Sequence, residues 1–119
     1  MTITDDIKDE HLNKSLLCYK ARRADGTWTE EQEIDLDPYF GDWDGWFDDK
    51  HPGYSKKSKN EKIDREYTGS PFHEELKLKA ELLMNNGEYR EPPQGIFLYP
   101  YFDLIDGTLQ YKGPIRANE

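Results

Sequence analysis

The chain has 119 residues, the size of a single domain. Its formal net charge of −9 argues against nucleic acid and anionic membranes as partners, because both are themselves negatively charged. Only 34% of the residues are hydrophobic, and no run of apolar residues is long enough to cross a membrane, so we expect no membrane insertion.

The N-terminal third reads as short strands joined by a turn. Residues 5–14 are polar, with two spaced apolar residues, and predict a short strand or a single turn. Loose alternation predicts a strand over 15–23. The Asp-Gly pair in 24–26 predicts a hairpin turn into a returning strand over 27–36.

A second turn and a less regular stretch follow. Asp37 before Pro38 is typical of the N-cap and first position of a short helical turn. Asp44-Gly45 predicts a further turn into a short strand. Residues 48–73 are rich in Lys, Gly, Pro and Ser and predict a long surface loop or connector, with a short strand or turn near 63–67.

Residues 73–86 can be interpreted as either helix or strand. The segment HEELKLKAELLMNN contains good helix formers throughout. The strict alternation from Leu76 to Leu82, and the similarity to 15–23, nevertheless predict a strand. We therefore predict an all-β fold of eight to ten short strands with short 3-10 or helical turns.

Two segments of the chain are copies of one pattern. Residues 34–47 (IDLDPYFGDWDGWF) and 96–109 (IFLYPYFDLIDGTL) are identical at seven of 14 positions, at an offset of 62. The match extends upstream, where 16–28 aligns with 77–89 at an offset of 61. Two copies predict one pseudo-symmetric domain in which any site appears twice. The expected division is a single domain over 1–119, with a first repeat near 3–49, a connector near 50–73 and a second repeat near 74–113.

The sequence carries no catalytic or metal-binding motif. The three histidines lie in polar segments, and carboxylate pairs such as Asp42 and Asp44 are expected by chance in so acidic a chain. An EF-hand loop centred on Gly45 would place Phe40 and His51 at ligand positions, so it fails. Asp44 is better explained as a turn residue. We expect no catalysis, no metal and no cofactor.

Residues 50–65 form a local basic stretch, with six Lys or Arg against two acidic residues. We interpret it as a solvated surface. A phosphate or nucleic-acid patch is the alternative, but the stretch lacks a glycine-rich cradle and offers only Tyr54 for stacking.

Cysteine usage and the N-terminus both favour a reducing compartment. Cys18 is the only cysteine, so no intrachain disulfide can form, and its place in an alternating segment predicts a packed thiol. The acidic start MTITDDIKDE has no secretory signal. The expected location is cytoplasmic.

The repeated pattern resembles the cyanovirin-N homology (CVNH) family. The second copy carries Ile96, Leu98 and the closing I-D-G-x-L-x-Y signature over 105–111, and the first copy matches this series at Ile34, Leu36 and Asp44-Gly45. The segment LLCYKARRADGTW is similar to the fungal branch, which lacks disulfides. The resemblance implies a bilobal β fold whose halves exchange strands. It also implies a lectin for mannose-type, α1,2-linked high-mannose glycans, working without metal or catalysis.

The resemblance implies two sugar sites at opposite ends of the molecule. The first would contain Thr2, Asp5, Asp6, Arg22, Arg23, Ala24, Asp25, Asp103, Leu104 and Asp106. The second would contain Gly41, Asp42, Asp44, Pro52, Gly53, Tyr54, Met84, Asn85 and Asn86. Because Arg22, Ala24 and Leu104 depart from the family pattern, we favour the second site. The same departures leave open a protein-interaction module that kept the fold and lost one or both sugar sites.

Three further expectations follow from the alignment. The disulfide positions of other family members correspond to Ile7 with Ala21 and to Ser58 with Leu82. Trp43 aligns with apolar Ile105 and is expected in the core, whereas Trp46 aligns with Thr108 and is expected to be half-buried or exposed. The hinge used for domain-swapped dimers corresponds to 50–53, and the longer connector here favours a monomer over such a dimer.

Overall fold

The computed structural model describes residues 3–69 and 73–113, which form two short 3-10 helices and ten strands. The first copy contributes η1 (Ile3–Asp6), β1 (Ile7–Asn13), β2 (Leu16–Ala21), β3 (Gln32–Asp35), β4 (Gly41–Trp43) and β5 (Trp46–Asp48). The second contributes η2 (Tyr54–Lys57), β6 (Ser58–Tyr67), β7 (Glu74–Leu82), β8 (Gln94–Phe97), β9 (Phe102–Ile105) and β10 (Thr108–Tyr111). The all-β prediction is confirmed, including the strand over most of 73–86. In the described part of the chain, no helix has the length and apolar character needed to cross a membrane.

The strands form four small antiparallel sheets that repeat the same order. β1-β2-β3 corresponds to β6-β7-β8, and the hairpin β4-β5 corresponds to β9-β10. Even the irregularities recur: β1 has a register shift after Lys8 and β6 has one after Lys59. Each shift places a residue at positive φ, Asp9 at 55° and Asn60 at 56°. These are residue types that tolerate the left-handed region.

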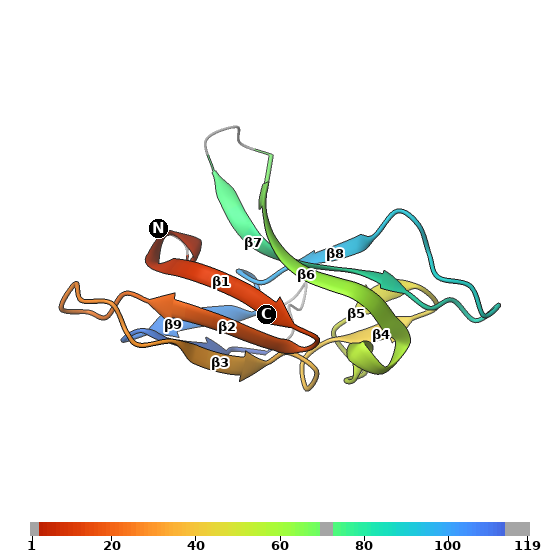
Figure 1. The fold of residues 1–119 in the computed structure, drawn as a ribbon, viewed down its shortest axis with the longest axis horizontal. Helices are drawn as coiled ribbons and strands as arrows, with labels where there is room; N and C mark the ends of the chain where they lie inside the picture. The colour runs from red at the N-terminus through yellow and green to blue at the C-terminus, as the bar shows by residue number, and fades with distance from the viewer. Residues whose placement is uncertain (1–2, 70–72, 114–119) are drawn as a thin grey trace.

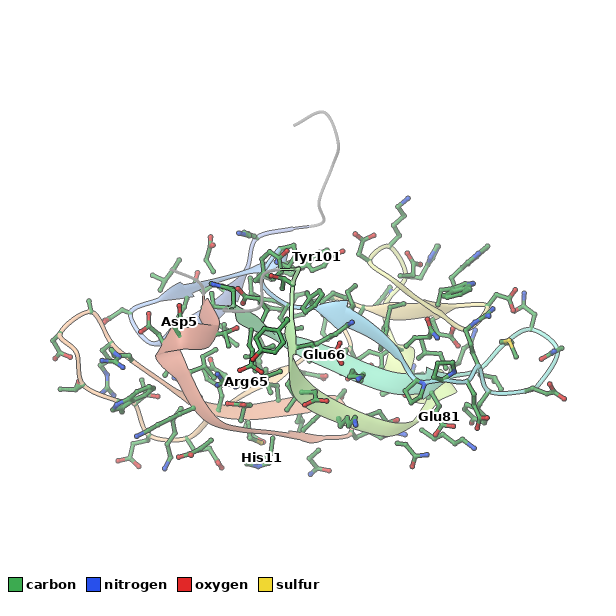
Figure 2. The ribbon with its side chains drawn as sticks, turned by 90° about the horizontal axis from the view of Figure 1, so that it is seen from above. Asp5, His11, Arg65, Glu66, Glu81 and Tyr101 are labelled. Carbon is green, nitrogen blue, oxygen red and sulfur yellow. The ribbon has the colours of Figure 1, made fainter. Side chains whose placement is uncertain are left out.

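Strand β6 corrects the prediction for 48–73. A ten-residue strand runs through this stretch, where only a short strand or turn was expected. The β6-β7 hairpin continues past the end of the β1-β2 hairpin through three more pairs, from Arg65↔Leu76 to Tyr67↔Glu74. The extension is anchored, because the Arg65 guanidinium binds both carboxylate oxygens of Glu10 at 2.8 and 2.9 Å. Figure 2 shows Arg65 in the middle of the molecule, far from either end.

Each half of the molecule combines strands from both copies. In Figure 1 the β4-β5 hairpin of the first copy lies with β6, β7 and β8, and β9 lies with β1, β2 and β3. Hydrogen bonds join the exchanged pieces: Leu109 N–H donates to the Tyr19 hydroxyl at 3.0 Å, and Arg90 donates to the Asp44 carbonyl at 3.1 Å. The strand exchange implied by the resemblance is therefore present.

The repeated Pro-Tyr-Phe segments meet at the centre of the core. Phe40 and Phe102 are fully or almost fully buried with ring centroids 6.3 Å apart. Each also packs edge-on against the tyrosine of the other copy, Phe40 on Tyr101 and Phe102 on Tyr39. Reciprocal aromatic contacts of this kind stabilise both halves together.

Asp37 does not act as the predicted N-cap. The turn over 37–40 is closed by the Leu36 carbonyl, which accepts from the N–H groups of Tyr39 and Phe40 at 3.1 and 3.3 Å. The Asp37 carboxylate instead accepts from the Ser55 N–H at 2.9 Å and from the Ser55 hydroxyl. It therefore ties the turn between β3 and β4 to η2.

Buried side chains without a disulfide occupy the positions that the resemblance aligned with disulfides. Ile7 lies opposite Ala21 and Ser58 lies opposite Leu82 in the strand register, and all four are buried. Cys18 is also buried, as predicted, and burial together with Glu33 and Glu31 raises the pKa of its thiol.

Candidate functional site

The same turn-to-turn contact occurs at both ends of the long axis (Figure 1). At one end Ala24 N–H donates to Asp106 Oδ1 at 3.0 Å, and at the other Asn85 N–H donates to Asp44 Oδ1 at 2.8 Å. Asp44 and Asp106 have φ of 48° and 45°, and the glycine after each also has positive φ, as in the two-residue turns that favour Asp-Gly. Each aspartate thus shapes its own turn and binds a turn from the other copy.

The paired turns are in close contact at both ends. A Cβ on Gly45 would lie 2.7 Å from Met84 Cγ, and one on Gly107 would lie 2.6 Å from Thr29 Cγ2. A side chain in either position would therefore push the two turns apart, so glycine is required for the contact as well as for the turn.

At the first end, the predicted residues bind one another. The Arg22 guanidinium lies 3.3 Å from the Asp6 carboxylate, and Arg23 donates to the Trp28 carbonyl at 3.0 Å. Hydrogen bonds from Thr27 hold the pKa of the Asp25 carboxyl below its usual value. The structure thus brings Asp6, Arg22, Ala24 and Asp106 together. Several of their polar groups already bind one another, because Arg22 pairs with Asp6 and Ala24 N–H donates to Asp106.

Three other residues predicted for the first site are not part of this group, and a fourth lies outside the described residues. Asp103 forms an ion pair with Lys112 at 3.1 Å, and Leu104 packs against the core. Asp5 is exposed in η1, and Thr2 lies outside the described residues. The surface at the first end therefore consists of an ion pair and apolar groups beside the two turns that Asp106 and Ala24 join, which we call a turn pair.

The second end keeps exposed polar groups. Asn85 and Asn86 are exposed; Asn86 accepts a hydrogen bond from Glu88 N–H at 2.9 Å. Asp42 Oδ1 accepts from Gly45 N–H at 2.8 Å, while Asp42 Oδ2 is buried and has no hydrogen-bond partner among the described residues. Burial accordingly raises the pKa of the Asp42 carboxyl.

Arg90 joins the turn pair to an aromatic surface. Its guanidinium carbon lies 3.8 Å from the centroid of the Trp46 ring, and its buried Nε, like Asp42 Oδ2, has no partner within the described chain. Buried polar groups in proteins are nearly always satisfied, so each of these two atoms, the Asp42 acceptor and the Arg90 donor, is suited to bind a further polar group.

Four residues predicted for the second site are either buried or line a separate hollow. Tyr54 is fully buried and donates to the Lys14 carbonyl at 3.3 Å, so it belongs to the core and offers no surface to a ligand. Gly41 is also buried, with no room for a Cβ beside the His51 carbonyl. Pro52 and Gly53 line a separate hollow of about 270 Å³, together with Asp35, Asp37, Pro38 and Lys56.

The prediction that Trp43 lies in the core is wrong. Its side chain is 64% exposed, Trp46 is 50% exposed as expected, and the aligned Ile105 is exposed as well. The two tryptophans face each other across the β4-β5 hairpin, and Trp43 stacks on His51 with ring centroids 5.8 Å apart. They line a hollow of about 310 Å³ with Phe47, Asp48, Lys50 and His51.

Sequence reasoning therefore missed Trp43, His51 and Arg90 as residues near the second turn pair. The available signal was a disagreement between the copies. At the upstream offset of 61, Arg90 aligns with Thr29, and at the downstream offset of 62, Trp43 aligns with Ile105. Such breaks in the repeat mark positions that the shared scaffold does not require.

Comparison with known proteins identifies structural neighbours only. No family model matches the sequence, and no curated protein sequence matches it. Among solved structures, the CVNH protein of T. borchii is 27% identical, with 94% of this chain and 100% of that chain covered and a TM-score of 0.72. A designed cyanovirin-N homolog lectin is 24% identical (94% and 100% covered, TM-score 0.74), and the CVNH protein of Gibberella zeae is 23% identical (92% and 95% covered, TM-score 0.72).

Two more distant neighbours were solved with carbohydrate. Microvirin, 16% identical with a TM-score of 0.66, is in complex with mannobiose. A MoCVNH3 variant, 15% identical with a TM-score of 0.69, is in complex with (N-GlcNAc)4.

Proposed function

We propose that this chain, which has the fold of the cyanovirin-N homology family, is a carbohydrate-binding lectin whose working site is the turn pair of Asp44 and Asn85. The neighbours solved with mannobiose and with (N-GlcNAc)4 support a carbohydrate ligand. Binding on this proposal needs no metal and leads to no reaction.

The contrast between the two ends carries the proposal. Both ends have the same backbone geometry, so the scaffold is duplicated. Only the second end presents an exposed amide, Asn85, where the first presents Ala24. An amide group both donates and accepts, which matches the hydroxyl groups of a sugar.

The finer proposal is a mannose-type glycan with α1,2 linkages. The mannobiose complex of microvirin supports this choice among sugars. A disaccharide fits the scale of one turn pair, and a longer glycan can extend from it over Trp46 and Trp43. Exposed indole rings are good platforms for the apolar faces of pyranose rings, because they bury large apolar areas with little loss of conformational freedom.

Exchanging the corresponding residues of the two ends tests the proposal. Asn85→Ala gives the second end the residue of the first, and Ala24→Asn does the reverse. We expect calorimetric titration with α1,2-mannobiose to show at least a tenfold loss of affinity for Asn85→Ala, since a hydrogen bond to a sugar hydroxyl is worth about 1 kcal/mol or more and leaves its partner unpaired when removed.

Ala24→Asn should leave the affinity of the second site unchanged, and so should Asn13→Ala, which removes an exposed asparagine from β1 far from either turn pair. If Asn85→Ala binds as tightly as the wild type, the assignment of the site is wrong. If no variant, including the wild type, binds any mannoside, the proposed ligand is wrong.

A protein-interaction module is the second candidate function. The exposed Trp43 and Trp46 beside a hollow favour it, because tryptophan is enriched at the centre of protein interfaces. On this alternative, Trp43→Ala abolishes capture of a defined protein partner while Asn85→Ala has no effect on that capture.

A further inference from the structure

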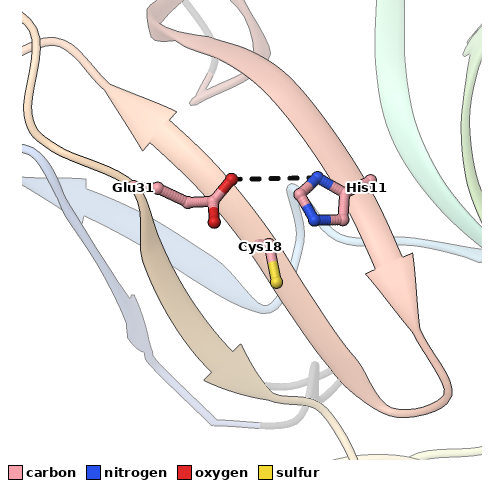
Figure 3. Close-up of side chains that lie close together, drawn as sticks. All are labelled: His11, Cys18 and Glu31. Atoms are coloured by element: carbon pink, nitrogen blue, oxygen red, sulfur yellow. Dashed lines mark ion pairs between the residues drawn. The ribbon is translucent and has the colours of Figure 1, made fainter.

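One cluster of potential metal ligands lies outside both turn pairs. His11 on β1, Cys18 on β2 and Glu31 just before β3 have donor atoms that all lie within 4.8 Å of one another (Figure 3). His11 Nδ1 is 4.0 Å from Glu31 Oε1. In the described part of the chain, this is the one group of three or more His, Cys, Asp or Glu side chains that could hold a metal ion.

The strand register explains why these side chains meet. The register shift in β1 sets His11 directly opposite Cys18, and Cys18 lies directly opposite Glu33 on β3. Directly opposed residues point to the same face of a sheet, with Cβ atoms about 5 Å apart. Three strands thus present a row of imidazole, thiol and carboxylate. Glu31 belongs to the same face because it precedes Glu33 by two residues.

Glu33 lies next to this group and could turn its carboxylate towards it as a fourth donor. One of its carboxylate oxygens lies 3.9 Å from Cys18 Sγ. Neither Glu31 nor Glu33 forms an ion pair with a lysine or arginine of the described chain; the one ion-pair partner of Glu31 is His11. Two carboxylates without a lysine or arginine partner, next to an imidazole and a thiol, form a negative site open to a cation.

We propose that His11, Cys18, Glu31 and Glu33 bind one divalent transition-metal ion, with Zn²⁺ the best match. A nitrogen, a sulfur and carboxylate oxygens are the ligand types that zinc takes in proteins, whereas Ca²⁺ and Mg²⁺ take oxygen ligands. Coordination displaces the proton of the Cys18 thiol into solvent, so the bound sulfur is a thiolate.

The distances allow this with small movements. Zinc bonds of about 2.0–2.3 Å place tetrahedral ligand atoms about 3.3–3.8 Å apart, so the donors of His11, Cys18 and Glu31, which lie within 4.8 Å of one another, must approach by about 1.5 Å at most. The His11 and Glu31 side chains are 57% and 52% exposed and can turn without disturbing the core, while buried Cys18 is held in place. Figure 2 shows His11 at the outer edge of the molecule, where an ion can enter.

Cobalt titration of the reduced protein tests the site. Co²⁺ bound to a thiolate gives an intense charge-transfer band in the near ultraviolet, so we expect that band to saturate at one Co²⁺ per chain and to be removed by one equivalent of Zn²⁺. Cys18→Ser should abolish the band. His11→Ala and Glu31→Gln should lower the Co²⁺ affinity at least tenfold, and Glu33→Gln should lower it by a smaller factor, because its carboxylate lies farther from the other donors.

Two matched controls keep the test specific. Glu30→Gln changes the neighbouring glutamate outside the cluster, and His51→Ala removes a histidine at the other side of the molecule; both should bind Co²⁺ like the wild type. Circular dichroism of each variant shows whether it is folded. The proposal fails if the folded wild type gives no thiolate band. It also fails if His11→Ala retains wild-type affinity, because binding would then be by the thiol alone.

Discussion

At the scale of single residues, Gly41 shows how closely the strand β4 approaches the hinge. A Cβ built on Gly41 would lie 1.5 Å from the carbonyl oxygen of His51. Because the obstacle is backbone, it cannot turn aside as a side chain can. Gly41 is thus a structural residue of the second half, in place of the ligand contact predicted for it.

Gly41→Ala is expected to destabilise the protein by about 3 kcal/mol or more, since the main chain of the hinge must move to admit the methyl group. Gly26→Ala is the control: it has a positive φ of 89° but nothing within 4 Å of the new Cβ, so only the backbone strain of about 1 kcal/mol applies. Urea unfolding of both variants measures the difference. Similar losses for the two would show that Gly41 has more room than the structure indicates.

Asp42 is a residue whose charge opposes folding. Burial raises the pKa of its carboxyl, with the Gly45 N–H acting in the other direction. The folded protein therefore holds this proton more tightly than the unfolded chain does. The contribution of the Asp42 carboxyl to the stability of the folded protein is therefore most favourable in acid, below the unfolded pKa of about 3.9. This contribution is lost as the pH rises through the higher pKa of the folded state.

Asp42→Asn keeps the Oδ1 acceptor for Gly45 and removes the charge. We expect the Tm of the variant relative to the wild type to be more favourable at pH 7 than in the acid range below the carboxyl pKa. Thermal unfolding followed across that range supplies the measurement. A Tm difference that is constant with pH, or that becomes more favourable in acid, would contradict the burial of the Asp42 charge.

At the scale of elements, the longest strand of the second copy was the hardest to predict. β6 is rich in lysine and polar residues, and only Ser58 of its ten residues is buried, so no apolar alternation identifies it as a strand. The repeat did not reveal it either, because the extra pairs in the β6-β7 hairpin change the offset between the copies just there. β7 was predicted correctly for the opposite reason, since its leucines alternate strictly and its offset of 61 continues through the turn that follows it.

The site residues also divide into those that a local sequence pattern predicts and those that it does not. Asp44 and Asp106 could be predicted because Asp-Gly turns have a strong sequence signal. That Asn85 and Asp44 belong to one site came from the resemblance, since no local pattern links residues so far apart, and the structure adds the hydrogen bond between them. Tyr54 and Trp43 were placed wrongly because an aromatic side chain can fill a core or cover a surface, and the direction it takes depends on strand register that a single sequence does not reveal.

The extended β6-β7 hairpin is held to β1 by one arginine. Arg65 binds Glu10 through two nitrogens and also donates to the Ile7 carbonyl at 2.9 Å. Arg65→Ala should lower the free energy of unfolding by about 2 kcal/mol, because these are hydrogen bonds to a charged group in a half-buried place. Lys62→Ala on the same strand loses only an exposed ion pair and should change stability by less than about 0.5 kcal/mol. Equal effects in denaturant unfolding would show that Arg65 does not anchor the hairpin.

At the scale of the whole molecule, the two copies share one core and one backbone arrangement, while the surface residues at the two ends differ. The central aromatic contacts are reciprocal between the copies, so the core is shared and both ends inherit the same turn-to-turn contact. The ends then differ in chemistry: one has Arg22 paired with Asp6, and the other has exposed Asn85. The central claim is that a symmetric fold here supports one working carbohydrate site.

An NMR titration of isotope-labelled protein with α1,2-mannobiose tests this claim most directly, because it detects binding, counts sites and locates them in one experiment. We predict saturable shifts of amide signals in 42–46 and 84–90, with the signals of 22–25 and 103–107 nearly unchanged. Equal shifts at both ends would contradict the single working site. The absence of any shift at high sugar concentration would contradict the mannoside-binding function itself.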